Sequence, residues 1–424
     1  MESGPLPSRV ETLVVGAGQA GLVMSSFLSA AGRDHLLLER RDRLGGGWLD
    51  RWDEFCLVTP NWTASLPGFP YDGADPDGFM PRDEIAGRIA RYADVIHAPI
   101  RLDIEVRRLS QRPTGGFDVA TDDGTVRAGT VVVATGGFHI PRVPAVSREL
   151  PARVVQLHSH LYRNERELPP GGVLVVGSGQ SGVQLAEELQ DAGREVFLSV
   201  GSAPRVPRRY RGADIFRWMS EVAARGAAVG ISLPTAETLP DPRMRLAANG
   251  HLSGHGGGHE VDLRQLAAGG ITLTGHLDGA DGETVRFAPD LARNLASADG
   301  WFDERLRPLI DAFIERSGVD APPDDRQPFP FDPPEIAELD LGAAGISTVI
   351  WTSGYRMDFS WIDGLPLDEQ GFPRHRRGVS DVPGLYFLGL PWQHTQTSAA
   401  LPGVGPDGRY LAGRMGLVPE GLPA

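Results

Sequence analysis

Near the N-terminus, the apolar and polar positions follow the order of a β-α-β unit. A short apolar run at 11–15 precedes a glycine-rich turn at 16–21, and residues 22–31 are mostly helix formers. A second apolar run at 35–38 ends the unit. Runs this short predict buried parallel strands, and the turn between strand and helix brings the backbone to the start of the helix.

The same order recurs later in the chain. Residues 173–176 form an apolar run, 177–182 a glycine-rich turn, 183–192 a helical pattern and 195–200 a second strand. The second turn begins 161 residues after the first. This distance is too long for a solenoid repeat and suits two copies of one domain type.

Three other segments differ from these units. Residues 102–133 alternate between apolar and polar positions and are interrupted by turn residues, which predicts antiparallel strands. Residues 249–258 are rich in glycine and contain two histidines, which indicates a mobile loop. Residues 322–334 contain six prolines, which indicates a linker.

Two later apolar runs bear on how the domains are connected. Residues 347–351 and 385–388 predict strands that have no obvious place in the second unit. We therefore expect a discontinuous first domain of residues 1–150 and 340–424, with a second domain of residues 151–339 inserted in it.

The composition is typical of a soluble globular protein, with 41% hydrophobic and 23% charged residues among 424. The 41 basic and 55 acidic residues give a formal net charge of −14. A protein that binds nucleic acid or an anionic membrane usually shows the opposite sign or a basic block, so we expect neither partner. No apolar stretch is long and uninterrupted enough for stable membrane insertion, and residues 1–7 do not resemble a secretory signal.

The residue types that are missing exclude several chemistries. All basic residues are arginine, which removes a pyridoxal Schiff base and the phosphate-loop lysine. Cys56 is the only cysteine, which excludes an internal disulfide and a redox pair of cysteines. Such a chain fits the reducing cytoplasm, where we expect the protein to be.

The glycines of the two turns have the spacing of dinucleotide-binding proteins. They are Gly16, Gly18 and Gly21 in the first turn and Gly177, Gly179 and Gly182 in the second. The first glycine of such a turn allows a tight bend, the second lets the backbone approach a pyrophosphate, and the third lets helix and strand pack closely. The N–H groups at the helix start then bind phosphate. One such turn alone is weak evidence for a dinucleotide site, but two turns in the same strand–turn–helix context predict two dinucleotide sites.

The two units differ where the ribose of a dinucleotide would lie. Glu39 ends the second strand of the first unit, where a carboxylate can accept the ribose hydroxyls. The equivalent residue of the second unit is Val200, and Arg205 and Arg208 follow it. An acid would repel a 2′-phosphate and an arginine would bind it. We therefore expect FAD at the first turn and NADPH at the second, although a solvated basic loop would contain the same arginines.

With these motifs the chain resembles the class B flavoprotein monooxygenases, which include flavin-containing monooxygenases, N-hydroxylases, Baeyer–Villiger enzymes and YUCCA-type enzymes, and most of all the CzcO-like bacterial flavoproteins. Besides the two turns, the matching segments are 44–48, 134–136, 352–355 and 389–395.

The match to the family fingerprint is incomplete. The fingerprint places phenylalanine and glycine six and four residues before a histidine. If that histidine is His158, Ala152 and Val154 stand at those positions. His158 and Tyr162 themselves are retained, as in the YUCCA-like branch, and the Baeyer–Villiger version of the fingerprint is not met.

The resemblance implies an α/β fold with two Rossmann-like domains, the NADP domain inserted in the FAD domain. It implies that NADPH reduces the flavin, that a C4a-(hydro)peroxyflavin forms with O2, and that a small molecule is oxygenated at nitrogen, sulfur or a carbon beside a carbonyl. An NADPH oxidase or flavin reductase that releases H2O2, and a nucleotide-sensing flavoprotein without turnover, are the alternatives. The sequence leaves a homodimer open.

The resemblance and the turns together assign the residues that contact the cofactors. Those expected at FAD are Gly16, Gly18, Gln19, Gly21, Glu39, Arg40, Gly47, Trp48, Val106, Thr135, Gly136 and Gly389. Those expected at NADPH are Gly177, Gly179, Gln180, Ser181, Gly182, Arg205 and Arg208.

One residue resembles a catalytic group of the family. Asn61 matches the asparagine near the flavin C4a carbon, where its amide can hydrogen-bond a peroxyflavin. An asparagine after a proline can equally cap a turn. The histidines of the glycine-rich segment recur every four residues, but glycines there disfavour a helix, so no metal site is predicted.

Overall fold

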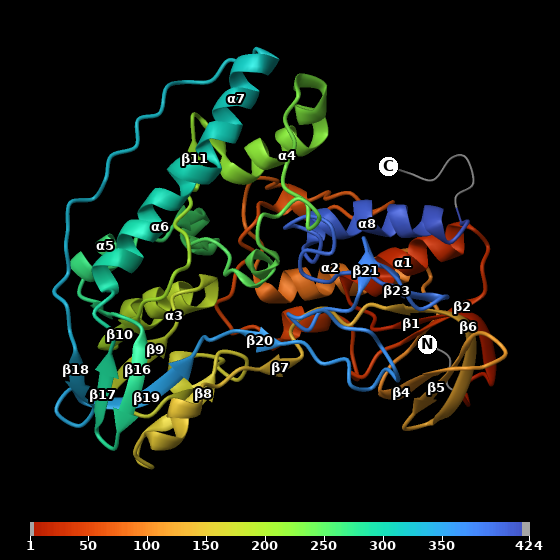
Figure 1. Cartoon of the computed structure of the whole chain (residues 1–424), viewed down its shortest axis with the longest axis horizontal. Helices are drawn as coiled ribbons and strands as arrows, with labels where there is room; N and C mark the ends of the chain where they lie inside the picture. The colour runs from red at the N-terminus through yellow and green to blue at the C-terminus, as the bar shows by residue number, and fades with distance from the viewer. Residues whose placement is uncertain (1–3, 418–424) are drawn as a thin grey trace.

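The computed structural model describes residues 4–417 and contains two main sheets, a mixed one and a parallel one, each with helices packed on it. The two units lie side by side along the long axis of the molecule, the first at the right of Figure 1 and the second at the left. None of the helices in residues 4–417 is long and apolar enough to cross a membrane.

The first sheet has nine strands, and its main path runs β21-β22-β23-β6-β1-β2-β3. Its strands are β1 (Arg9–Val15), β2 (His35–Leu38), β3 (Ile100–Arg101), β4 (Val106–Gln111), β5 (Phe117–Thr121), β6 (Gly124–Val133), β21 (His375–Arg376), β22 (Val379–Ser380) and β23 (Leu385–Phe387). β1 pairs in parallel with β2 and β6, and β23 pairs in parallel with β6. β4, β5 and β6 form the antiparallel hairpins that the alternating pattern predicts.

Three helices belong to this first sheet. They are α1 (Gln19–Ala30), α2 (Arg82–Val95) and α8 (Leu401–Arg414). α1 and α8 pack together (Figure 1), and Gly408 allows their close approach, because a Cβ there would lie 2.7 Å from Val23. The apolar faces of these helices and of β1 form the core, in which Val14, Val23 and Leu411 are fully buried.

The second sheet has five parallel strands in the order β15-β10-β9-β19-β8. They are β8 (Val155–His158), β9 (Gly172–Val176), β10 (Val196–Ser199), β15 (Thr272–Thr274) and β19 (Ile346–Trp351). The helices of this unit are α3 (Gln180–Asp191), α4 (Ile215–Arg225), α5 (Leu263–Ala268), α6 (Leu291–Arg305) and α7 (Arg307–Ser317). Every residue of β9 is buried, which explains why the sequence shows an apolar run rather than an alternating one.

The position of β19 corrects the sequence-based assignment. Residues 347–351 were expected in the returning part of the first domain, but β19 pairs with β8 and β9 of the second sheet. The apolar pattern specifies a strand buried on both faces, and it does not specify which sheet receives it. The chain returns to the first unit only beyond Trp351, where β20 (Tyr355–Arg356) pairs with the outgoing β7 (Ile140–Pro141).

The glycine-rich segment is a hairpin rather than the expected mobile loop. Its strands are β13 (Leu252–Ser253) and β14 (His259–Glu260), which pair in antiparallel fashion. The remaining short strands are β11 (Arg209–Tyr210), β12 (Ala213–Asp214), β16 (Leu277–Asp281), β17 (Thr284–Phe287) and β18 (Glu338–Asp340). His251, just before β13, is completely buried.

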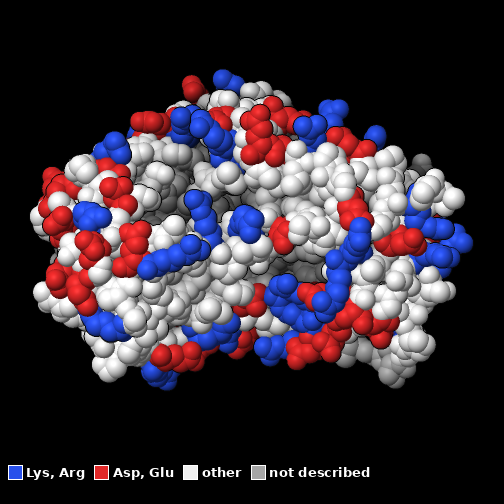
Figure 2. Space-filling model, turned by 60° about the horizontal axis from the view of Figure 1, so that its bottom comes forward, with Lys and Arg blue, Asp and Glu red and all other residues white. Residues whose placement is uncertain are grey.

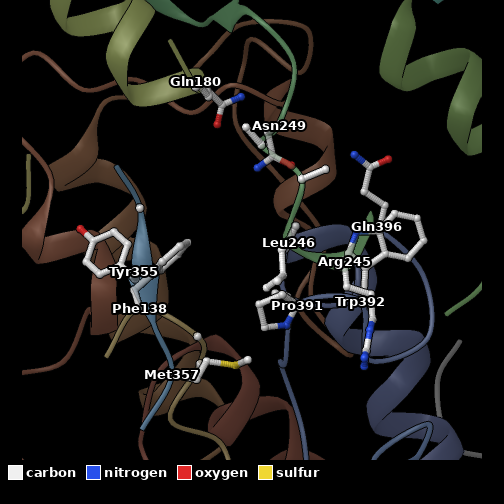
Figure 3. A pocket seen from close by; sticks show the side chains of 18 of the residues that line it. Phe138, Gln180, Arg245, Leu246, Asn249, Tyr355, Met357, Pro391, Trp392 and Gln396 are labelled. Carbon is white, nitrogen blue, oxygen red and sulfur yellow. The ribbon is translucent and has the colours of Figure 1, made fainter. Parts of the chain in front are cut away.

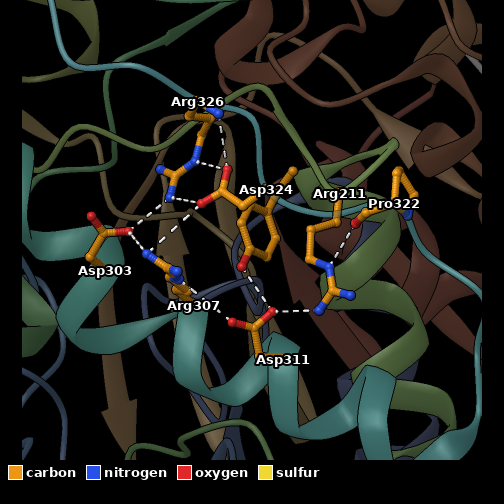
Figure 4. A network of polar contacts seen from close by, with 8 residues as sticks. Arg211, Asp303, Arg307, Asp311, Pro322, Asp324 and Arg326 are labelled. Atoms are coloured by element: carbon orange, nitrogen blue, oxygen red, sulfur yellow. Dashed lines mark hydrogen bonds and ion pairs between the residues drawn. The ribbon is translucent and has the colours of Figure 1, made fainter.

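The proline-rich linker runs along the outer edge of the second unit from α7 to β18 (Figure 1). Ion pairs hold its first part against the helices (Figure 4). Arg326 contacts Asp303 at 2.8 Å and Asp324 at 2.9 Å, and the hydrogen bond from Arg326 lowers the pKa of Asp324. Arg211 donates to the carbonyl oxygen of Pro322 at 2.9 Å. The linker is therefore extended but held in place.

A half-buried carboxyl group on α3 should make stability depend on pH. The Tyr162 hydroxyl donates to Glu188 at 2.9 Å, and burial, with smaller contributions from Glu54 and Glu165, raises the pKa of Glu188 to about 7. The folded protein therefore holds this proton up to a higher pH than the unfolded chain does. The stabilisation that this group contributes is complete below its pKa in the unfolded chain. It is lost as the pH rises through its pKa in the folded protein.

The variant Glu188→Gln stays neutral at both pH values. We predict that its free energy of unfolding, relative to that of the wild type, increases by roughly 1–2 kcal/mol from about pH 5 to pH 8. Urea unfolding of both proteins at the two pH values measures this difference. The exposed Glu167→Gln serves as the control and should show no such change. An equal pH dependence in Glu188→Gln and the wild type would contradict the prediction.

Candidate active site

One continuous cavity of about 3030 Å³ lies between the two units and reaches both glycine-rich turns. Figure 2 shows the molecule hollowed on this face, with arginine side chains around the hollow. Most of the residues assigned from the sequence line this cavity: Gly16, Gly18, Gln19, Glu39, Arg40, Gly47, Trp48, Val106, Thr135, Gly136, Gly177, Gly179, Gln180, Ser181 and Gly389. The structure thus brings together segments that are far apart in the sequence.

The three glycines of the first turn have different environments. Gly16 has a φ of 101°, and a Cβ there would lie 2.7 Å from the carbonyl oxygen of Ala134. A Cβ on Gly21 would lie 1.9 Å from the carbonyl oxygen of Gly16, so this glycine serves packing and does not line the cavity. A Cβ on Gly18 would meet only the Cα of Gly46, at 3.9 Å. A side chain at Gly18 would therefore project into cavity space, which suits a bound diphosphate.

Glu39 is held at the end of β2. Its carboxylate accepts hydrogen bonds from the backbone N–H of Ala17 at 2.9 Å and of Arg41 at 3.1 Å. The side chain is buried against protein but lines the cavity. Arg41 is paired with Asp50, whereas Arg40 is exposed to the cavity. The remaining acceptor capacity of Glu39 fits a ribose with two free hydroxyls.

Hydrogen bonds link three distant segments around the first turn. Trp48 Nε1 donates to Gln19 Oε1 at 2.9 Å, and Gln19 Nε2 donates to the carbonyl oxygen of Ala399 at 2.7 Å. Gly389 has a φ of 86°, and a Cβ there would lie 2.8 Å from the Cβ of Ala20. The start of α1, the loop around Trp48 and the segment before α8 therefore form one wall.

The second turn repeats the geometry of the first. A Cβ on Gly177 would lie 3.0 Å from the carbonyl oxygen of Thr352, and one on Gly182 would lie 1.9 Å from that of Gly177. At Gly179 the nearest atom is the Cβ of Ala248, at 3.4 Å. The middle glycine again faces the cavity, so the backbone at both turns fits the diphosphate of a dinucleotide.

His251 is a site residue that the sequence did not identify. Its Nε2 donates to the carbonyl oxygen of Ser178 in the second turn at 2.7 Å. Burial lowers the pKa of His251 to about 4, so the imidazole is neutral and carries its proton on Nε2. The glycine-rich hairpin thereby stabilises the second turn.

The two arginines expected at a 2′-phosphate have other partners. Arg205 contacts Asp262 at 2.5 Å, Asp299 at 3.0 Å and Glu260 at 3.4 Å. It does not line the cavity. A phosphate contact by Arg205 would require these carboxylates to be released.

Arg208 is likewise turned away from the cavity. Its guanidinium donates to the carbonyl oxygens of Val58 at 2.9 Å and Ser253 at 2.8 Å, and it approaches Asp214 at 3.4 Å. It also lies 4.6 Å from the centroid of the Phe79 ring. Arg208 therefore joins the hairpin to the first unit.

Both ends of the Asn61 amide are engaged. Oδ1 accepts from the backbone N–H of Met80 at 2.6 Å, and Nδ2 donates to the carbonyl oxygen of Asp75 at 2.9 Å. Asn61 is buried and does not line the cavity, although its neighbour Trp62 does. This geometry favours the turn-closing role over a direct contact with flavin.

Comparisons with known proteins identify the family of this chain. The pyridine nucleotide-disulphide oxidoreductase family matches residues 13–217. An oxidoreductase of Geobacillus kaustophilus described as CzcO-like is 33% identical over 406 residues, which cover 95% of this chain and 97% of that protein. The indole-3-pyruvate monooxygenase YUCCA1 of Oryza sativa is 29% identical over 225 residues, which cover 51% of this chain and 55% of that protein.

A solved structure shares the fold. The flavin-containing monooxygenase of Stenotrophomonas maltophilia superposes with a TM-score of 0.61 at 20% identity, covering 97% of this chain and 99% of that one. The two dinucleotide turns and the family match point to the class of oxidoreductases that use a pyridine nucleotide. Within this class the chain belongs to the CzcO-like oxidoreductases, as the sequence motifs predict.

We predict that Gly18→Val folds normally but purifies without FAD, because its side chain enters the cavity without meeting protein atoms. Gly179→Val is the matched variant and should retain FAD while losing the binding of NADP⁺. Flavin absorbance and calorimetric titration measure the two properties, and circular dichroism reports folding. Yellow Gly18→Val protein with a full complement of FAD would disprove the assignment of the first turn.

Proposed function

We propose that the protein is an NADPH-dependent monooxygenase that binds FAD at the first turn and NADPH at the second and oxygenates a small organic molecule. The observation that carries this proposal is that one cavity reaches the middle glycines of both turns. A single chamber would hold both dinucleotides, and when bound they would supply the hydride transfer. The net charge of −14 supports a small-molecule substrate rather than nucleic acid, and we propose that the protein works in the cytoplasm.

When bound, the flavin supplies hydride acceptance and the activation of O2. The residues of this chain bind and orient the two cofactors. Gly18 and the start of α1 would hold the diphosphate of FAD, and Glu39 its ribose hydroxyls. Gln180 and Ser181, at the start of α3, would hold the diphosphate of NADPH.

Asn61 would influence the oxygen chemistry indirectly, because its hydrogen bonds stabilise part of the cavity wall. Its two hydrogen bonds close residues 61–80 into one loop, whose residues Trp62 and Thr63 line the cavity. A closed loop would exclude water from the part of the cavity that this loop lines. A direct hydrogen bond from Asn61 to the cofactor would require the contact with Met80 or Asp75 to break.

An NADPH oxidase that releases H2O2 is the second candidate. The observation that favours it is the same engagement of the Asn61 amide, since the donor expected beside the flavin is already used. A disulfide reductase with a redox pair is excluded by the single cysteine.

We expect oxygen from labelled O2 to appear in at least one product when NADPH and a panel of thioethers, amines, ketones and 2-oxo acids are supplied. Mass spectrometry detects the label, and a peroxidase assay measures H2O2 in the same samples. Asn61→Ala should release more H2O2 per NADPH while its flavin is reduced at the wild-type rate. Stoichiometric H2O2 from the wild type with every compound would favour the oxidase, and no reduction of the flavin by NADPH would favour a sensor.

We further propose that the 2′-phosphate of NADPH is bound by His276 and Ser202 instead of Arg205. Both line the cavity, Ser202 shortly after β10 and His276 shortly after β15, and these two strands pair with each other. His276→Ala should lower the preference for NADPH over NADH by about tenfold, the value of one hydrogen bond to a charged group. Arg205→Ala should leave the ratio of the two kcat/KM values unchanged. Loss of the preference in Arg205→Ala alone would restore the sequence-based assignment.

A further inference from the structure

Arg51 is half-buried in the cavity wall and has no carboxylate partner. Its guanidinium is 5.4 Å from the centroid of Phe55 and 5.2 Å from that of Phe138, and it lines the cavity. Among residues 4–417, no side chain forms an ion pair or hydrogen bond with this guanidinium. The neighbouring carboxylate, Asp50, is paired with Arg41. A guanidinium stays charged in a protein, and burying it unpaired is costly.

The other arginines of the cavity wall differ from Arg51. Arg41 and Arg245 have carboxylate partners. The rest are exposed to solvent: Arg40, Arg142, Arg305 and Arg356. Within the described part of the chain, Arg51 is thus the only arginine of the cavity that is half-buried and has no carboxylate partner. Burial lowers its pKa, which the charges of Tyr355 and Asp50 oppose.

Polar and apolar groups beside Arg51 fit a small organic acid. The Phe138 and Tyr355 rings pack with their centroids 5.0 Å apart, and the Tyr355 hydroxyl is 3.5 Å from Nδ1 of His160. Arg51, Tyr355 and His160 all line the cavity, so three groups able to donate hydrogen bonds face the same space.

Opposite this group the cavity has an apolar wall. Phe138 is 58% exposed and Leu246 is 59% exposed, which is unusual for large apolar side chains in a protein with a full core. Figure 3 shows Phe138, Tyr355 and Met357 on one side of the cavity and Leu246 and Pro391 on the other. An apolar body between these walls would cover both exposed surfaces.

We propose that Arg51, with Tyr355 and His160, binds the carboxylate of a substrate whose apolar body lies between Phe138 and Leu246. This inference rests on the proposed function and names its substrate class. The planar guanidinium matches a carboxylate with two parallel hydrogen bonds, and the surrounding rings strengthen the attraction by excluding water.

The diphosphates of the two dinucleotides are the competing source of negative charge. Each has its own set of N–H donors at the start of α1 or α3. Arg51 instead lies beside Phe138 and Tyr355, at the crossing between the units. We therefore assign it to the substrate, and the experiment distinguishes the two sources.

The test uses two thioethers that differ in one group, 4-(methylthio)benzoate and thioanisole. Calorimetric titration of the FAD-loaded enzyme should show the acid binding at least tenfold more tightly than the neutral compound. Arg51→Gln should bind both compounds equally, with unchanged affinity for NADP⁺ and unchanged FAD content. Arg51→Lys should keep part of the preference, and the exposed Arg142→Gln should keep all of it.

Three results would overturn the proposal. They are equal binding of the two compounds by the wild type, a preference that survives in Arg51→Gln, and a loss of NADP⁺ affinity in Arg51→Gln, which would assign the guanidinium to the dinucleotide. Failure of the proposed function is seen separately, as an absence of flavin reduction by NADPH, because the titration needs no turnover.

Discussion

Backbone packed directly on backbone at the two glycine-rich turns fixes the geometry of the cavity. Gly16 lies against Ala134, and Gly177 lies against Thr352. Just beyond each of these partner residues the chain leaves its sheet for the other unit, through β7 and β20, which pair with each other. Each glycine-rich turn is therefore packed against the start of a segment that crosses to the other unit. The distance between the two turns is therefore set by backbone contacts that leave no room for a side chain.

A second connection lies on the other side of the cavity, at the hairpin of β13 and β14. Its Gly254 approaches so closely that a Cβ would lie 2.1 Å from the carbonyl oxygen of Leu57. Arg208 donates to Val58 in the first unit and to Ser253 in the hairpin, while His251 holds Ser178 in the second turn. The hairpin thus contacts both the second glycine-rich turn and the segment at Leu57 and Val58, which lines the cavity. A shift of either unit would disturb buried hydrogen bonds, which favours one fixed arrangement of the two units.

The sequence predicted those features whose causes are local. The turn around Gly18 and the carboxylate of Glu39 belong to one short unit, in which spacing and residue type alone determine the geometry. Features that depend on distant partners were not predictable in the same way. The pattern of residues 347–351 indicated a buried strand, but only its pairing with β9 places it in the second sheet. Arg208 looked like a phosphate ligand because its partner Val58 is 150 residues away and leaves no periodic signal.

Two arginine side chains bind the carbonyl oxygens of loops in the first unit and at the crossing between the units. These loops lack regular hydrogen bonding, so their carbonyl oxygens need donors from side chains. Arg88 donates to Ala64, Phe69 and Pro70. Arg163 likewise donates to the carbonyl oxygens of Asp50, His160 and Tyr162. The planar fork of an arginine reaches several carbonyls at once, which the single ammonium of a lysine does less well, and it does not lose its proton when buried. The shape of the chamber in which the flavin would work is therefore held by groups whose charge does not change with pH.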